Sequence, residues 1–346
     1  MHIDIIDFGT YKKHDVKKIR LNNDNAVSIS VLTMGAILNE FLVPDGNKTK
    51  NIVLGFDNIS EYYQNPFYVG MSIGRTAGRI KNGKIPLTPL GEETITLPQN
   101  EGTKNHQGGP NGFYSYLWNY RLHTDKDFLS VTLYRTIHSS EDGFPGDINV
   151  SITFKLTNDN ELSITYTGIS TADTLFNPTA HIYFNLNGQD NDILNHKLTL
   201  ASDSYLEVDT DKVPTGELIP VANTPFDFRK PRTLKNTVQE LSDTSEKGLD
   251  DIFKLRNLKG EKVKLENPGT HDSIQLFSAR NGLVVYTANT FDSSMKFSHQ
   301  SGHPYMGIAL EAQTLSDTHN HPNFGDISLT ANAEKTYEIR YQYSSN

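Results

Sequence analysis

Two residues in this sequence combine acid–base chemistry with a rigid local setting. His181 lies in the strand-forming run Asn177–Leu186, and Glu311 lies in the apolar run Gly307–Gln313. A side chain on a strand is held stiffly, which suits a group that must deliver or accept a proton at one fixed point. We therefore hypothesise that His181 and Glu311 meet across a pocket as a general acid and a general base.

The strand expected around Glu311 has one apolar and one polar face. Ile308, Leu310 and Ala312 share the first face, whereas Glu311 and Gln313 share the second. Because an unpaired buried carboxylate is costly, the polar face points either to solvent or to a cavity. The sequence leaves both possibilities open.

The surroundings of His181 are polar for a strand. Tyr183 lies two residues along, on the same face, and Asn177 and Asn185 flank the run. A lone histidine on an apolar strand is usually a satisfied core residue, but this lining favours a site.

Two arginines lie four residues apart in the segment Gly74–Ile80. Its glycines do not form a dinucleotide fingerprint, which would need a GxGxxG pattern between a strand and a helix. Arg75 and Arg79 could hold the hydroxyls of a ligand, because a guanidinium offers five donors. A structural salt bridge is the simpler interpretation of this segment alone.

Further candidates lie in two loops. His106 belongs to the glycine-rich stretch Asn105–Gly112, where it either donates to a ligand or is tied to the loop backbone. Asp250 and Asp251 are adjacent, so on an extended chain they point apart and cannot act as a carboxylate pair. One could face a pocket, and for Asp251 we favour a solvated turn.

Metal binding has little support in the sequence. Asp317, His319 and His321 form a permissible ligand pattern, but no further histidine or cysteine cluster completes it. A turn-rich loop beside the Glu311 strand is the favoured interpretation, and we expect no metal.

Composition narrows the class of protein. The 346 residues carry a formal net charge of −9 and no cysteine. The acidic charge argues against nucleic acid or an anionic membrane as a partner. The absence of cysteine excludes disulfides and cysteine nucleophiles and fits a reducing compartment. Met1–Gly9 shows no signal peptide, and no run is long enough for a membrane helix. We expect a soluble cytoplasmic protein.

Alternation of apolar and polar residues predicts many strands and few helices. The clearest strand patterns lie at 27–32, 129–134, 150–156, 162–167 and 336–343. The two short helical segments lie at 60–64 and 233–241. Such a series predicts an all-β fold, a large antiparallel β-sandwich, in one continuous domain over residues 1–346.

Taken together and in this order, the motifs resemble those of the aldose 1-epimerases, the galactose mutarotases. The matching segments are 74–80, 105–109, 177–186, 248–250, 307–313 and 320–322. The resemblance runs from about residue 30 to the end of the chain.

The resemblance implies a galactose mutarotase-like supersandwich whose open face holds a monosaccharide. It implies His181 as general acid and Glu311 as general base. The residues it implies for substrate binding are Arg79, His106, Tyr183, Asp250 and Asn289. At the position of Asn289 some members of the family have glutamine. Two further positions depart from the family pattern: Gly78 stands where many members have asparagine, and Asp251 replaces a frequent histidine.

The implied reaction interconverts the α and β anomers of a free aldohexose such as galactose or glucose. Opening the ring needs a proton on the ring oxygen and removal of another from the C1 hydroxyl, without cofactor or metal. A histidine of pKa about 6.5 and a glutamate of pKa about 4.3 would supply these forms at neutral pH with little tuning. We expect the two side chains to stand far enough apart to hold the C1–O5 edge between them.

Other functions stay open at this point. A disaccharide with a free reducing end, such as maltose, needs only a more open pocket. A phosphorylated hexose would need a basic cluster, and none is evident near the motifs. A non-catalytic carbohydrate-binding sandwich shares the fold, and either a monomer or a homodimer is compatible with the sequence.

Overall fold

Antiparallel strands make up most of the regular secondary structure of this computed structural model, which describes residues 1–86, 94–188, 191–298 and 300–345. The helices are short, and α1 (Ile59–Tyr62) and α3 (Leu234–Glu240) correspond to the predicted segments 60–64 and 233–241. The four-residue helix α2 (Ser139–Asp142) was not predicted. Among the described residues, none of the helices has the length and apolar character needed to cross a membrane.

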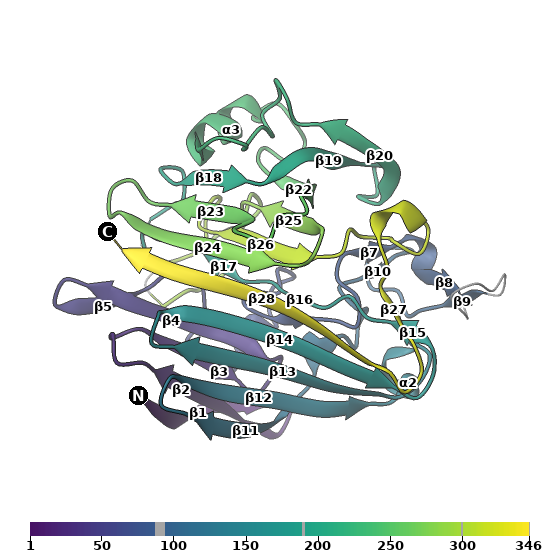
Figure 1. Cartoon of the computed structure of the whole chain (residues 1–346), viewed down its shortest axis with the longest axis horizontal. Coiled ribbons are helices and arrows are strands. Elements are labelled where there is room, and N and C mark those ends of the chain that lie inside the picture. The colour runs from purple at the N-terminus through teal and green to yellow at the C-terminus, as the bar shows by residue number, and fades with distance from the viewer. Residues whose placement is uncertain (87–93, 189–190, 299, 346) are drawn as a thin grey trace.

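The largest sheet has nine strands. Their order across the sheet is β11 (Asn119–Thr124), β12 (Phe128–Ile137), β13 (Ile148–Thr157), β14 (Glu161–Ser170), β28 (Glu334–Ser345), β24 (Asp272–Ser278), β23 (Val263–Glu266), β18 (Lys197–Leu200) and β21 (Arg232–Thr233). Figure 1 shows β12, β13, β14, β28 and β24 side by side across the molecule. In β13 every second side chain is buried, which is the alternation expected of a sheet with one face on a core.

A six-stranded sheet carries the residues of greatest interest. Its order is β17 (Tyr183–Phe184), β26 (Ile308–Gln313), β25 (Gly282–Tyr286), β22 (Asp250–Leu255), β19 (Ser202–Val208) and β20 (Pro214–Pro220). All residues of β26 are buried, so neither face of this strand meets bulk solvent.

The N-terminal strands form a five-stranded sheet, and four short pairs complete the fold. The sheet runs β1 (His2–Tyr11), β2 (His14–Asn22), β3 (Ser28–Leu32), β4 (Ile37–Asp45) and β5 (Lys48–Asn51). The pairs are β6 (Ser72–Ile73) with β16 (Thr179–Ala180), β7 (Arg79–Ile80) with β10 (Asn105–His106), β8 (Lys84–Pro86) with β9 (Thr94–Thr96), and β15 (Thr174–Leu175) with β27 (Ser328–Leu329).

One hydrophobic cluster joins the three large sheets. It includes Ile29 of β3, Phe154 of β13 and Leu310 of β26, each fully buried. The prediction of a large antiparallel sandwich is therefore confirmed, and the strands predicted at 27–32, 129–134, 150–156, 162–167 and 336–343 correspond to β3, β12, β13, β14 and β28.

The run around His181 differs from the single strand expected. It forms two strands of two residues, β16 and β17, which pair with β6 and β26 respectively. His181 lies between them, and its main chain donates to the carbonyl of Met71. The histidine is therefore fixed by two different sheets, not by one continuous ladder.

Candidate active site

A cavity of about 350 Å³ lies over one face of the six-stranded sheet. Its floor comes from that sheet, and its walls come from the segments 66–68, 78–79, 100–107, 208–212 and 311–316. The volume is within the range of small-molecule sites. His181, Glu311, Arg79, His106, Tyr183 and Asp250 all line it, so the fold brings six predicted site residues together.

Strand register explains how these side chains come to share one face. Glu311 of β26 pairs with Val284 of β25, and Asp250 of β22 pairs with Tyr286 of β25. Residues two apart on a strand share a face, so Val284 and Tyr286 form a floor between the two carboxylates. The polar face of β26 therefore points into a cavity and not to solvent.

His181 and Glu311 are in direct contact. The Nε2 atom of His181 lies 3.4 Å from Oε1 of Glu311, and both side chains are almost fully buried. This is closer than the expected separation, because no sugar atom fits between groups at that distance. The two groups instead stand side by side and face the cavity from the same wall.

Burial also changes the protonation states expected of the pair. Burial raises the pKa of the Glu311 carboxyl to about 8, and it lowers the pKa of the His181 imidazole to about 4. At neutral pH these two shifts favour a protonated Glu311 carboxyl and a neutral imidazole. The expectation of ordinary pKa values with little tuning is wrong for this environment.

Gln107 is a site residue that the sequence interpretation missed. Its Nε2 lies 3.3 Å from Oε2 of Glu311, and its Oε1 accepts a hydrogen bond from the main-chain N–H of Gly78. Gly78 has φ of +75°, and a Cβ there would lie 2.2 Å from the hydroxyl of Ser316. The only sequence signal was the position of Gln107 directly after His106.

The two arginines have different roles. Arg75 is buried and makes a two-pronged ion pair with Asp142, with N–O distances of 2.6 and 3.0 Å. Arg79 lines the cavity and makes a similar pair with Glu101, at 2.6 and 2.9 Å. The segment thus supplies one structural salt bridge and one guanidinium for the site.

His106 faces the same cavity as a neutral group. Burial, together with the nearby Arg79, lowers its pKa to about 3. Its ring stands edge-on to Tyr68, with ring centroids 5.7 Å apart. A neutral imidazole can both donate and accept, which suits a hydroxyl ligand.

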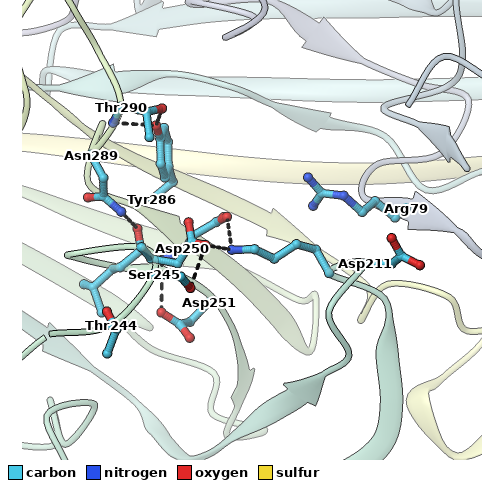
Figure 2. A network of polar contacts seen from close by, with 12 residues as sticks. Arg79, Asp211, Thr244, Ser245, Asp250, Asp251, Tyr286, Asn289 and Thr290 are labelled. Atoms are coloured by element: carbon cyan, nitrogen blue, oxygen red, sulfur yellow. Dashed lines mark hydrogen bonds and ion pairs between the residues drawn. The ribbon is translucent and has the colours of Figure 1, made fainter. Parts of the chain in front are cut away.

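Asp250 and Asp251 begin β22, so Asp251 does not lie in the solvated turn that we favoured. Asp250 lines the cavity, where Nζ of Lys212 lies 3.0 Å from its Oδ2. Asp251 points away from it, as expected of adjacent strand residues, and burial raises its pKa to about 7. Figure 2 shows these two carboxylates, with Arg79 standing apart from them.

Asn289 lies outside the cavity lining. Its Nδ2 donates to the carbonyl of Leu249 at 2.9 Å, and its Oδ1 accepts from the hydroxyl of Thr287. Figure 2 shows it beside Tyr286 and Asp250. In this position the amide holds the residue before Asp250, and a contact between Asn289 and a substrate stays a prediction.

The asparagines near His181 also face away from the cavity. The side-chain amide of Asn177 donates to the carbonyl of Thr314, and that of Asn185 donates to the carbonyl of Met306. Their role is to anchor the ends of the His181 segment to the β26 region.

Across the described part of the chain, no three His, Cys, Asp or Glu side chains are placed to hold a metal ion. Asp317 pairs instead with His319, at 3.3 Å between Oδ1 and Nε2. These residues lie in a turn-containing loop after β26, as favoured from the sequence, and Ser316 at its start lines the cavity.

Comparisons of the sequence with known proteins agree with one another. The model of the family described as Aldose 1-epimerase matches residues 17–342. An aldose 1-epimerase of Streptococcus thermophilus is 41% identical over 344 residues, which cover 97% of this chain and 96% of that protein. A maltose epimerase of Levilactobacillus brevis is 36% identical over 337 residues, which cover 97% of each chain.

Solved structures give the same result. A galactose 1-epimerase from Lactobacillus acidophilus has a TM-score of 0.87 and 26% identity, over 100% of this chain and 99% of that one. An aldose epimerase homologue from C. elegans has a TM-score of 0.86 and 26% identity, over 95% and 98% of the two chains. The galactose mutarotase-like fold predicted from the sequence is therefore confirmed.

Proposed function

Because this chain belongs to the aldose 1-epimerase family and is thus an isomerase, we propose that it interconverts the α and β anomers of free aldohexoses such as galactose and glucose. The observation that carries the proposal is the contact between His181 and Glu311 on one wall of the cavity. A hemiacetal carries its ring oxygen and its C1 hydroxyl on the same carbon. Two groups standing side by side can therefore reach both oxygens from one direction.

The reaction proceeds by moving two protons. His181 gives a proton to the ring oxygen while Glu311 takes one from the C1 hydroxyl, and the C1–O5 bond breaks to give the open-chain aldehyde. Rotation about C1–C2 presents the other face of the carbonyl, and the reversed transfers close the ring. The pair must hold one proton in total, and proton transfer across the 3.4 Å contact places it on His181 or on Glu311.

The other hydroxyls of the sugar are bound by Arg79, His106 and Asp250, with Tyr183 lining the site. These groups supply donors, acceptors and an aromatic surface within one cavity. Binding at several hydroxyls fixes the ring while leaving C1 free to turn.

The charge of the cavity favours a neutral sugar over a phosphorylated one. Besides Glu311, its lining has two cations, Arg79 and Lys212, against three carboxylates, Glu101, Glu246 and Asp250. Each cation is already paired, Arg79 with Glu101 and Lys212 with Glu246. Among the described residues of the lining, a phosphate would meet no unpaired cation and an excess of negative charge.

Maltose is the second candidate substrate, since the relative of 36% identity bears the name maltose epimerase. It requires the same acid–base chemistry at its reducing end. Comparing catalysed rates on glucose, galactose and maltose decides between the two substrates.

The setting of the enzyme completes the proposal. We expect it to act on free sugar in the cytoplasm, as a monomer or a homodimer, without nucleic acid or membrane. The net charge of −9 and the absence of cysteine support this setting.

Polarimetry on freshly dissolved α-D-galactose tests the function. We expect Glu311→Gln and His181→Gln to lower kcat by roughly 10²–10⁴, the usual value of a positioned proton transfer. Glu217→Gln and His271→Gln, at exposed positions, are the matched controls and should keep the wild-type rate. Wild-type rates in either site variant, with the fold intact by circular dichroism, would contradict the mechanism. A wild-type protein that binds galactose without accelerating its mutarotation would support the carbohydrate-binding alternative.

A further inference from the structure

Lys212 and Glu246 form an ion pair at one end of the cavity, which we call the end wall. We infer that the end wall determines the length of the substrate, so that the cavity encloses one hexose ring and obstructs a second one attached at its far side. The inference rests on the proposed function, because it assumes that the anomeric carbon lies at His181 and Glu311.

Strand spacing gives the length available to the sugar. Glu311 lies on β26 and Asp250 on β22, and only β25 separates these strands. Neighbouring strands are about 4.8 Å apart, so the two carboxylates project from strands about 10 Å apart. One pyranose ring, with a hydrogen bond of about 2.8 Å at each end, spans this distance over Val284 and Tyr286.

The end wall stands where a second ring would extend. Beyond Asp250 the sheet continues to β19, and Lys212 lies in the turn that follows this strand. Its Nζ lies 3.0 Å from Oδ2 of Asp250 and 2.6 Å from Oε1 of Glu246. The Lys212 and Glu246 side chains are 28% and 31% exposed, and both line the cavity.

The turn that carries Lys212 is fixed on both sides. The carboxylate of Asp209 accepts from the main-chain N–H groups of Asp211 and Val213, which closes the turn. Nζ of Lys104, which directly precedes β10, donates to the carbonyl of Asp211 at 2.8 Å. Lys212 therefore cannot move away without loss of contacts on the other side of the turn.

The segment that carries Glu246 is held as firmly. The hydroxyl of Tyr305 donates to the carbonyl of Lys247 at 2.7 Å, and the N–H of Leu249 donates to the hydroxyl of Thr287 at 3.0 Å. At Gly248 a Cβ would lie 2.3 Å from Oδ1 of Asn289, so the backbone packs closely there. A bulky sugar substituent must therefore displace the Lys212 and Glu246 side chains and cannot push the backbone aside.

The experiment compares kcat/KM for maltose with kcat/KM for glucose. In Glu246→Gly and Lys212→Ala we expect the maltose-to-glucose ratio to rise at least tenfold over wild type, because the end wall is shortened. Glu246→Gln keeps the volume of the side chain and should leave the ratio within about twofold of wild type. Asp211→Ala removes a neighbouring exposed carboxylate of the same turn and is the matched control.

Two outcomes overturn the inference. One is a wild-type ratio already near one, and the other is an unchanged ratio in both shortened variants. If the wild-type protein accelerates no mutarotation, the proposed function fails. Calorimetry on the same variants then gives the dissociation constants for glucose and maltose. Their ratio decides whether the end wall limits the length of the sugar that binds.

Discussion

The acid–base pair gains its properties from burial. Glu311 and His181 are each nearly inaccessible to water, and the loss of hydration disfavours the charged form of both. Their pKa values move toward and past one another, so at neutral pH burial favours the neutral form of both groups. A buried carboxyl next to a neutral imidazole can pass a proton in either direction, which matches a reaction that runs both ways.

The pH dependence of activity follows from counting protons on the pair. Below about pH 4 the pair takes up a second proton, so no base remains, and above about pH 8 it loses the last one, so no acid remains. We expect kcat/KM to follow a bell-shaped curve with limbs near these values, measured by polarimetry after subtraction of the spontaneous rate. A limb near pH 6.5, as for an exposed histidine, would contradict this assignment.

At the scale of elements, the strands place the site and the loops complete it. β26, β25 and β22 present Glu311, Val284, Tyr286 and Asp250 on one face by their register. The loop before β22 depends on side-chain hydrogen bonds, of which the one from Asn289 to Leu249 lies next to Asp250. Asn289 is therefore a positioning residue for the carboxylate that we propose binds sugar.

Asn289→Ala tests this positioning role. Loss of this hydrogen bond leaves the carbonyl of Leu249 with the main-chain N–H of Thr287 alone and loosens Asp250, at a cost of about 0.5–1.5 kcal/mol. We expect KM for galactose to rise up to about tenfold with kcat within about twofold, because His181 and Glu311 keep their places. Asn119→Ala, exposed on β11, is the control. Equal losses in kcat and in thermal stability would indicate a general structural role instead.

The sequence predicted the regular strands well and the irregular site segment poorly. β13 and β14 have clear alternation because one face is buried along their whole length. The run around His181 lacks such a signal, since its two halves pair with β6 and β26, which are far apart in the sequence. Strand propensity cannot show a change of partner within ten residues.

The site residues could be identified from the sequence, but the distances and contacts between them could not. The motifs identified six candidates that all line one cavity: His181, Glu311, Arg79, His106, Tyr183 and Asp250. Whether Glu311 faced solvent or a cavity depended on the segments 66–68, 78–79 and 100–107, which form walls of the cavity. The contact with Gln107 depended on a loop held at positive φ, which no periodicity reveals.

At the scale of the whole molecule, the cavity draws on segments from most of the chain. Its walls include Phe67, Glu101, His181, Asp250 and Glu311, which no unfolded chain brings together. A ligand that bridges these walls binds the folded state alone. Sugar binding and global stability must therefore be linked.

Galactose should consequently raise the melting temperature of the protein. At about 100 times the dissociation constant, binding adds about 2.7 kcal/mol to the free energy of unfolding, which shifts Tm by several degrees. Differential scanning calorimetry measures the shift, and galactitol at the same concentration controls for general osmolyte effects, since it has no ring. The variant Asp250→Ala should lose most of the Tm shift that galactose causes beyond that of galactitol. It lacks the carboxylate that lies at the end of the cavity far from Glu311. An equal shift with galactitol, or a full shift in Asp250→Ala, would show that the cavity does not hold the sugar in this way.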